Sequence, residues 1–252
     1  MKVIFHHDFY KVYAGDPAAS AGRMEAIVEV IEPWVDFIAA QPAAKEDISA
    51  VHSKSHMEWV KRTGVYHEAA LAAGGAIQAA VLGLEEPCFG LIRPPGHHAS
   101  SSDAWGFCYF NNMAIALEYL NKNRKIKSAY VLDIDLHFGD GNVNILESKD
   151  YVTVHNVSAG DRYEYIEEVR KEMAQCNVDI IGISAGFDNH ENVWGGTLTT
   201  DDYQKIGRMV SEAAGRCRGG CFALLEGGYN HRVLGYNVMA LLKGLSGEKM
   251  SK

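Results

Sequence analysis

The segment with the clearest potential for chemistry is Asp133-Ile134-Asp135-Leu136-His137, which follows an apolar run. Side chains alternate between two faces of an extended chain, so Asp133, Asp135 and His137 would point to the same side. Two carboxylates and an imidazole on one face would repel one another, or be costly to bury, unless a cation lies among them. The segment therefore predicts a metal site, and a solvated glycine-rich turn is the alternative.

A further candidate ligand is Asp188, which follows the apolar run that ends in Ala185-Gly186-Phe187. A single Asp after a strand is often only a helix or turn cap. Beside the Asp-Ile-Asp-Leu-His strand, however, it can supply a third ligand, and two carboxylates with one imidazole leave a coordination position open for catalysis. This ligand set is harder than that of the usual His-rich zinc site, so Fe²⁺ or another divalent ion is not excluded.

Two other segments carry polar groups after apolar runs. His97 and His98 follow Arg93-Pro94-Pro95-Gly96, and His can act as a general base or a general acid near neutral pH. A structural role explains the pair equally well. Tyr229 follows the pair Gly227-Gly228, where a sharp turn could present its hydroxyl as a donor to a developing oxyanion. A tyrosine considered alone more often serves packing.

These segments are positioned by apolar runs of strand length that alternate with segments of helical period. The alternation predicts an α/β fold in which a mostly parallel sheet lies between layers of helices, and the length suits a single domain over residues 1–252. The predicted strands are Lys2–Phe5, Cys88–Ile92, Ser128–Ile134, Tyr151–His155, Val178–Ser184 and Cys221–Leu225. The predicted helices are Ser20–Val30, Ser55–Arg62, Tyr66–Leu82, Asn112–Leu120, Glu164–Gln175, Thr200–Arg216 and Val233–Leu245.

Composition narrows the functional classes. The chain has 32 acidic and 24 basic residues and a net charge of -8, which argues against general nucleic-acid binding because that affinity comes mainly from Lys and Arg. An acidic surface weakly favours cationic partners, although solubility alone explains it as well. No apolar run is long enough for a transmembrane helix or a secretory signal, so we expect a cytoplasmic protein with no membrane partner.

Five motifs in order resemble those of the histone deacetylase superfamily, which includes the acetoin-utilisation and acetylpolyamine deacetylases of bacteria and archaea. They are RPPGHHA (93–99), GFCYFNN (106–112), DIDLHFGDG (133–141), SAGFD (184–188) and LEGGYN (225–230). The similarity extends from about Phe5 to the end of the chain. It implies the arginase/deacetylase fold, a three-layer α/β/α domain with a mostly parallel sheet of about eight strands.

The resemblance also implies a role for each matching residue. Asp135, His137 and Asp188 match the catalytic metal ligands, which moves Asp133 out of the ligand set. The remaining matches are His97 and His98 with the histidine dyad, Asp133 and Asp140 with the carboxylates that pair with it, Tyr229 with the catalytic tyrosine, and Gly106 and Phe107 with the wall of the acyl-lysine tunnel. Arg23 resembles, more loosely, an arginine near the internal acetate pocket.

The implied activity is that of a zinc-dependent amidohydrolase of class EC 3.5.1.-, which removes an acetyl or other acyl group from an amine such as acetyl-lysine or an acetylpolyamine. Zn²⁺ is the expected metal and Fe²⁺ an alternative. A structural K⁺ is expected near Asp133, Asp135 and His137. The implied partner is therefore an acetylated amine, either a small molecule or a protein. The sequence determines neither the physiological substrate nor the oligomeric state.

The chain departs from the family pattern in three places. Phe138 stands where many relatives have a second His, and the segment after His155 is shorter than the corresponding loop of eukaryotic relatives. The part of the tunnel wall opposite Phe107 is therefore expected to be missing or to come from elsewhere, with Tyr163 and Tyr165 as candidates to replace it. The region Thr63–Tyr66 has no clear counterpart of the rim aspartate that grips a peptide backbone. These departures favour a small or exposed acyl-amine over a histone tail.

Two other functions are compatible with parts of the pattern. A ureohydrolase on the same fold would hold two metal ions and would need a second carboxylate-rich strand end. Asn189 and His190, which follow Asp188, do not provide one. A non-catalytic protein that binds acyl-amines should lack at least one chemical group, whereas the dyad, the ligands and Tyr229 are all present.

Overall fold

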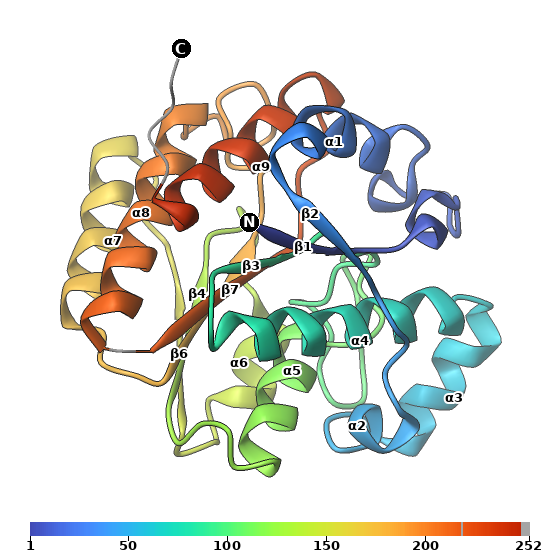
Figure 1. Ribbon diagram of the computed structural model, residues 1–252. Helices are drawn as coiled ribbons and strands as arrows, with labels where there is room; N and C mark the ends of the chain where they lie inside the picture. The colour runs from blue at the N-terminus through green and yellow to red at the C-terminus, as the bar shows by residue number, and fades with distance from the viewer. Residues whose placement is uncertain (218, 248–252) are drawn as a thin grey trace.

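The predicted strands pair into one sheet in which every pairing is parallel. In the computed structural model, which describes residues 1–217 and 219–247, seven strands follow the order β2-β1-β3-β7-β6-β4-β5 (Figure 1). Their bounds are β1 Lys2–Phe5, β2 Asp36–Ala39, β3 Cys88–Gly90, β4 Ala129–Asp133, β5 Val152–Asn156, β6 Ile180–Ala185 and β7 Gly220–Leu225. The α/β fold class is confirmed, with seven strands where about eight were expected.

Helices cover both faces of the sheet (Figure 1). One layer contains α1 (Arg23–Ile31), α7 (Arg162–Gln175), α8 (Thr200–Cys217) and α9 (His231–Ser246). The other contains α4 (Tyr66–Gly83), α5 (Asn112–Lys122) and α6 (Asp140–Leu146), with α2 (Lys45–Ser49) and α3 (Lys54–Thr63) beside them. Every residue of β4, β6 and β7 is buried, because a parallel sheet between two helical layers exposes neither face. This explains why these strands are almost wholly apolar in sequence.

Several elements differ from the sequence prediction at their ends. The helix predicted from Ser20 begins at Arg23, after Gly22 in a left-handed conformation. The helix predicted from Ser55 begins at Lys54, and its N-cap is Ser53, whose side chain accepts the hydrogen bond from the backbone of His56. Edge strand β2 and short helix α6 were not predicted. Both are too short for hydrophobic periodicity to reveal them.

The strand order brings the chemical segments to one edge of the sheet. Strands β3, β7, β6 and β4 are consecutive neighbours, and each is followed by one of the polar segments identified in the sequence. Because the strands are parallel, their carboxyl ends lie at the same edge, where ligands bind in open α/β sheets.

In the part of the chain that the structure describes, none of the helices combines the length and the apolar character of a membrane-spanning segment.

Candidate active site

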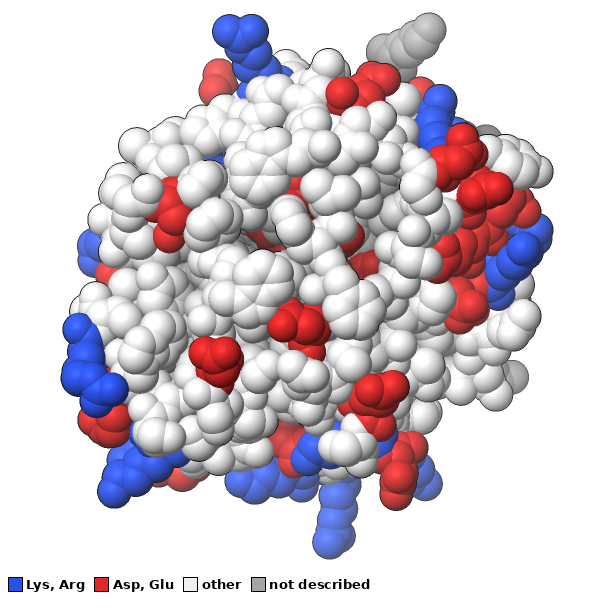
Figure 2. All heavy atoms as spheres, turned by 180° about the vertical axis from the view of Figure 1, so that it is seen from behind, with Lys and Arg blue, Asp and Glu red and all other residues white. Residues whose placement is uncertain are grey.

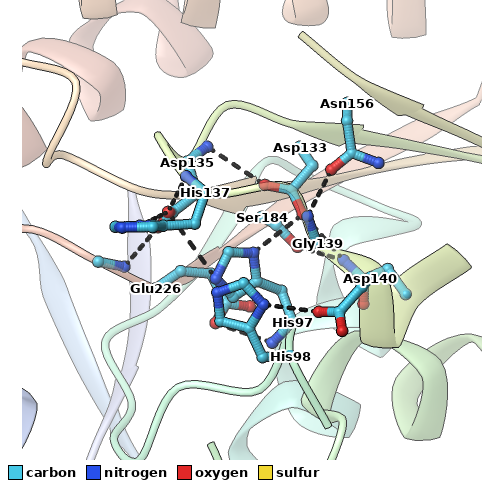
Figure 3. A network of polar contacts seen from close by, with 12 residues as sticks. His97, His98, Asp133, Asp135, His137, Gly139, Asp140, Asn156, Ser184 and Glu226 are labelled. Atoms are coloured by element: carbon cyan, nitrogen blue, oxygen red, sulfur yellow. Dashed lines mark hydrogen bonds and ion pairs between the residues drawn. The ribbon is translucent and has the colours of Figure 1, made fainter. Parts of the chain in front are cut away.

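Three potential metal ligands meet at this edge. Asp135 and His137 lie in the loop after β4, and Asp188 lies just after β6. One ligand atom from each lies within 4.8 Å of the others. Nδ1 of His137 is 3.3 Å from Oδ1 of Asp135 and 3.2 Å from Oδ2 of Asp188. Figure 3 shows the side chains of Asp135 and His137 converging above the histidine pair. The described residues contain no second cluster of this kind.

Backbone donors hold the two carboxylates in place. Oδ1 of Asp135 accepts from the backbone of His137 at 2.9 Å, and Oδ2 accepts from Gly227 at 2.9 Å. Oδ1 of Asp188 accepts from Leu136 at 3.1 Å. Each of the loops after β4, β6 and β7 therefore takes part in holding the cluster.

The cluster fits a divalent cation. Asp135 and Asp188 are 4% and 0% exposed, and Oδ2 of Asp188 has no hydrogen-bond partner in the described part of the chain. Burial and the neighbouring charge of Asp135 raise the pKa of Asp188. The adjacent carboxylates of Asp135 and Asp188 raise the pKa of His137 to about 10, which means that the cluster attracts positive charge. A cation satisfies all of these groups at once.

Two glycines let the backbone approach the ligand carboxylates closely. A Cβ added to Gly227 would lie 2.5 Å from Oδ2 of Asp188 and 2.6 Å from Oδ2 of Asp135. A Cβ at Gly186 would overlap the Asp135 carboxylate. The backbone approaches the carboxylates closely at these two positions, which only glycine permits.

His97 lies between two carboxylates (Figure 3). Its Nδ1 is 3.2 Å from Oδ2 of Asp133, and its Nε2 is 3.8 Å from Oδ1 of Asp135. Burial lowers the pKa of His97, but the charges of Asp135 and Asp133 outweigh burial and raise it well above its usual value. Asp133 also accepts from the side chain of Asn142 at 3.1 Å. The ring of His97 is therefore fixed from both sides.

His98 has a different electrostatic environment from its neighbour. Burial lowers the pKa of His98 to about 4, and the positive charge of His97 acts in the same direction. Its Nδ1 lies 2.7 Å from Oδ1 of Asp140. Burial raises the pKa of Asp140, but hydrogen bonds from Trp105 and His98 outweigh it and lower that pKa. The ionised carboxylate can only accept, so Nδ1 carries the proton and Nε2 is free to accept one.

Glu226 is a buried carboxylate that the sequence motifs include without assigning it a role. Its Oε2 accepts from the backbone of Gly96 at 2.7 Å and of His97 at 3.2 Å. It is fully buried, and burial raises its pKa to about 7. Its position at the end of an otherwise apolar strand was the available sequence signal, because a buried carboxylate requires partners.

The dyad, His137 and Tyr229 line a single pocket of about 300 Å³. Its other lining residues are Pro95, Trp105, Gly106, Phe107, Trp194 and Gly227. The ring of Tyr229 meets that of Phe107 edge-on at 5.9 Å and packs against Trp194 at 4.6 Å. Burial raises the pKa of Tyr229, which keeps its hydroxyl protonated and able to donate. The pocket therefore combines a cation site, two imidazoles and a phenol within an aromatic wall.

Two of the sequence expectations concern residues around this pocket. Tyr163 is 74% exposed, and Tyr165 is buried and donates its hydroxyl to the backbone of Ile134. Neither lines the pocket, so the prediction that one of them replaces the tunnel wall is wrong, and Trp194 is present there instead. Arg23 is buried behind Tyr229, with its guanidinium 5.3 Å from the ring centre. Trp194 and Trp105 were missed because neither belongs to a chemical motif.

Comparisons with known proteins agree with this arrangement. A profile of the histone deacetylase domain matches residues 18–165 and 155–245. A "probable deacetylase" of Methanothermobacter thermautotrophicus is 29% identical, over 98% of this chain and 91% of that protein. A "histone deacetylase-like amidohydrolase" of Pseudomonas aeruginosa is 25% identical, over 92% of this chain and 79% of that protein.

A solved structure supports the fold. The crystal structure of the HDA15 HD domain superimposes with a TM-score of 0.83, covering 99% of this chain and 90% of that one, at 24% sequence identity. The overall fold is therefore shared with that solved structure.

Proposed function

Because this chain belongs to the histone deacetylase family, we propose that it hydrolyses the amide bond of an acetylated amine with a divalent metal ion held by Asp135, His137 and Asp188. The observation that carries the proposal is the single pocket lined by His97, His98, His137 and Tyr229. These groups can supply a metal ligand, a base and an oxyanion donor to one acyl group.

In the proposed reaction, the residues around the pocket have separate tasks. A divalent cation in such a site supplies Lewis acidity and lowers the pKa of bound water. His98, with its Nδ1 proton directed to Asp140, accepts a proton from water at Nε2. The resulting hydroxide attacks the carbonyl carbon, and the hydroxyl of Tyr229 donates a hydrogen bond to the carbonyl oxygen as it becomes negative.

The second half of the reaction returns the proton. His98, or the dyad jointly, protonates the leaving nitrogen, so that the C–N bond breaks and acetate and a free amine are released. His97 is held by Asp133 on one side and faces Asp135 on the other, which suits it to keep a positive charge near the site.

We propose Zn²⁺ as the metal, with Fe²⁺ as the alternative, and a structural K⁺ near Asp133, Asp135 and His137. The donor set of one imidazole and two carboxylates supports a divalent ion without selecting between the first two. The presence of one ligand cluster among the described residues favours a single catalytic metal over the two ions of a ureohydrolase.

We propose a small or exposed acyl-amine as the substrate. Among the described residues, the pocket lining contains no Lys or Arg, so no lysine or arginine side chain in the lining would repel a cationic amine. Figure 2 shows the back of the molecule, where Lys and Arg lie toward the margins and Asp or Glu atoms are visible in hollows near the centre. This charge distribution is compatible with a cationic amine.

A substrate panel tests the proposal. Acetylated polyamines, acetyl-lysine peptides and longer acyl-lysines are incubated with Zn²⁺- and Fe²⁺-loaded protein, and release of the free amine is measured with and without chelator. We expect metal-dependent turnover that is fastest with small acetylated amines. A metal-loaded protein that binds acyl-amines and cleaves none of them would instead favour a non-catalytic binding protein.

Tyr229→Phe tests the oxyanion donor. Loss of one such donor should lower kcat by roughly 100-fold or more. KM should change little, because the phenyl ring preserves the packing against Phe107 and Trp194. An unchanged kcat in Tyr229→Phe would contradict the role assigned to this hydroxyl.

A further inference from the structure

Trp105 contacts the catalytic machinery although it lies at the pocket rim. Its side chain is 53% exposed, yet its Nε1–H donates to Oδ2 of Asp140 at 2.8 Å. Its ring packs against the ring of His98, with centroids 3.9 Å apart and an interplanar angle of 32°. A single exposed residue therefore contacts both members of the His98–Asp140 pair.

Asp140 is shared between these two partners. Oδ1 faces Nδ1 of His98 at 2.7 Å, while Oδ2 accepts from Trp105. The Asp140 side chain is 35% exposed, so water would compete for an oxygen that Trp105 did not occupy. The indole fixes the carboxylate plane and with it the direction of the Nδ1–H bond of His98.

We propose that Trp105 is a positioning residue that fixes the His98 ring, through Asp140 on one edge and by ring contact on one face. This inference rests on the proposed function, in which His98 is the base. Trp105 also lines the pocket, so the exposed part of a bound substrate touches the same indole that orients the base. Trp105 therefore links binding of the substrate to the orientation of the His98 ring.

The indole of Trp105 supplies both contacts. Phenylalanine at position 105 keeps a ring over His98 but has no donor for Asp140, whereas alanine removes both. Because Trp105 is half exposed, neither change should prevent folding. The pair of variants separates the hydrogen bond from the ring contact.

The kinetic test compares Trp105→Phe and Trp105→Ala with wild-type protein, all Zn²⁺-loaded, on the best substrate of the panel. Loss of a hydrogen bond to a charged group should lower kcat in Trp105→Phe by about tenfold. KM should stay within about threefold, because the ring surface remains. Trp105→Ala should lose more kcat and also raise KM. Trp34→Phe is the matched control, because Trp34 is 55% exposed and lies outside this pocket.

A second readout does not depend on activity. In Zn²⁺-loaded protein labelled with ¹⁵N-histidine, the Nδ1 proton of His98 should give a downfield resonance, which is assigned by its loss in His98→Ala. We expect this resonance to shift in Trp105→Phe, to broaden or vanish in Trp105→Ala, and to be unchanged in Trp34→Phe.

The outcomes separate the inference from the proposed function. A wild-type protein that cleaves no acylated amine contradicts the proposed function, while the His98 resonance still decides whether Trp105 positions the ring. An unchanged resonance in Trp105→Ala, or a kcat in Trp105→Phe within twofold of wild type, overturns the inference.

Discussion

At the scale of single residues, the pocket depends on a backbone conformation that few side chains allow. Gly106 has φ of 58° and the following residue, Phe107, has φ of 67°. Positive φ is uncommon for a bulky residue such as Phe107 and costs of the order of 1 kcal/mol or more. The turn brings Gly106 so close to His98 that an added Cβ would overlap Cδ2 of the ring.

Gly106→Ala should therefore disturb the base rather than the fold. The new methyl group would overlap the His98 ring and displace it, and a displacement of about 1 Å at a reacting group can cost roughly 100-fold in rate. We expect such a loss in kcat, measured with the best substrate, with a small decrease in Tm. Gly160→Ala is the control, because no atom lies within 4 Å of a Cβ there. Equal activity of the two variants would contradict this reading.

At the scale of elements, the site is held by contacts between loops that follow different strands. Glu226, at the end of β7, accepts from the backbone of Gly96 and His97 in the loop after β3. Gly227 donates to Asp135 in the loop after β4. The loops after β7, β3 and β4 are thus joined at the carboxyl edge of the sheet by polar contacts that no single element could form.

Glu226→Ala should destabilise the protein by about 2 kcal/mol or more, because it leaves two buried N–H groups without an acceptor. Glu226→Gln keeps an oxygen acceptor and should lose less stability. Urea denaturation of both variants measures the difference. Glu147→Ala, at an exposed position on the end of α6, should change little. If Gln and Ala were equally destabilising, the negative charge rather than the acceptor would be the stabilising feature.

At the scale of the whole molecule, folding brings carboxylates from distant parts of the chain into one buried cluster. Asp135 and Asp188 are 53 positions apart in sequence and meet because β4 and β6 are neighbours. Without a cation this cluster opposes folding, since burial of like charges is costly. Metal binding should therefore contribute to the stability of the native state.

Removing the metal should lower Tm. A ligand at 100 times its Kd stabilises the native state by about 2.7 kcal/mol, which corresponds to about 5–10 °C for a chain of this size. We expect this difference between Zn²⁺-loaded and chelator-treated protein by thermal denaturation. In Asp188→Asn the metal-free protein should be more stable than metal-free wild type, because one buried charge is gone, and the metal-induced shift should shrink. A wild-type Tm that is insensitive to Zn²⁺ would speak against the proposed site.

Sequence patterns predicted six of the seven strands, most of the helices and the chemical groups of the site. Strands covered on both faces must be apolar along their whole length, so β4, β6 and β7 were visible as uninterrupted apolar runs. Polar groups that directly follow such runs are placed at one edge by the parallel topology. The order of five motifs added the family and therefore the fold. Apolar runs and motifs are local in the sequence, and the placement of the polar groups at one edge depends only on the direction of the strands.

Which partners each side chain contacts became visible only in the folded molecule. Strand β4 ends at Asp133, so Asp135 and His137 lie in the loop beyond it, and Asp133 faces His97 instead of the ligand cluster. Trp105 and Trp194 became visible as parts of the pocket only through contacts with His98 and Tyr229. The contact of Trp194 with Tyr229 joins the loops after two different strands. The contact of Trp105 with His98 joins two residues that lie several positions apart within one loop. They depend on how the turns aim each side chain, which strand periodicity and motif spacing do not specify.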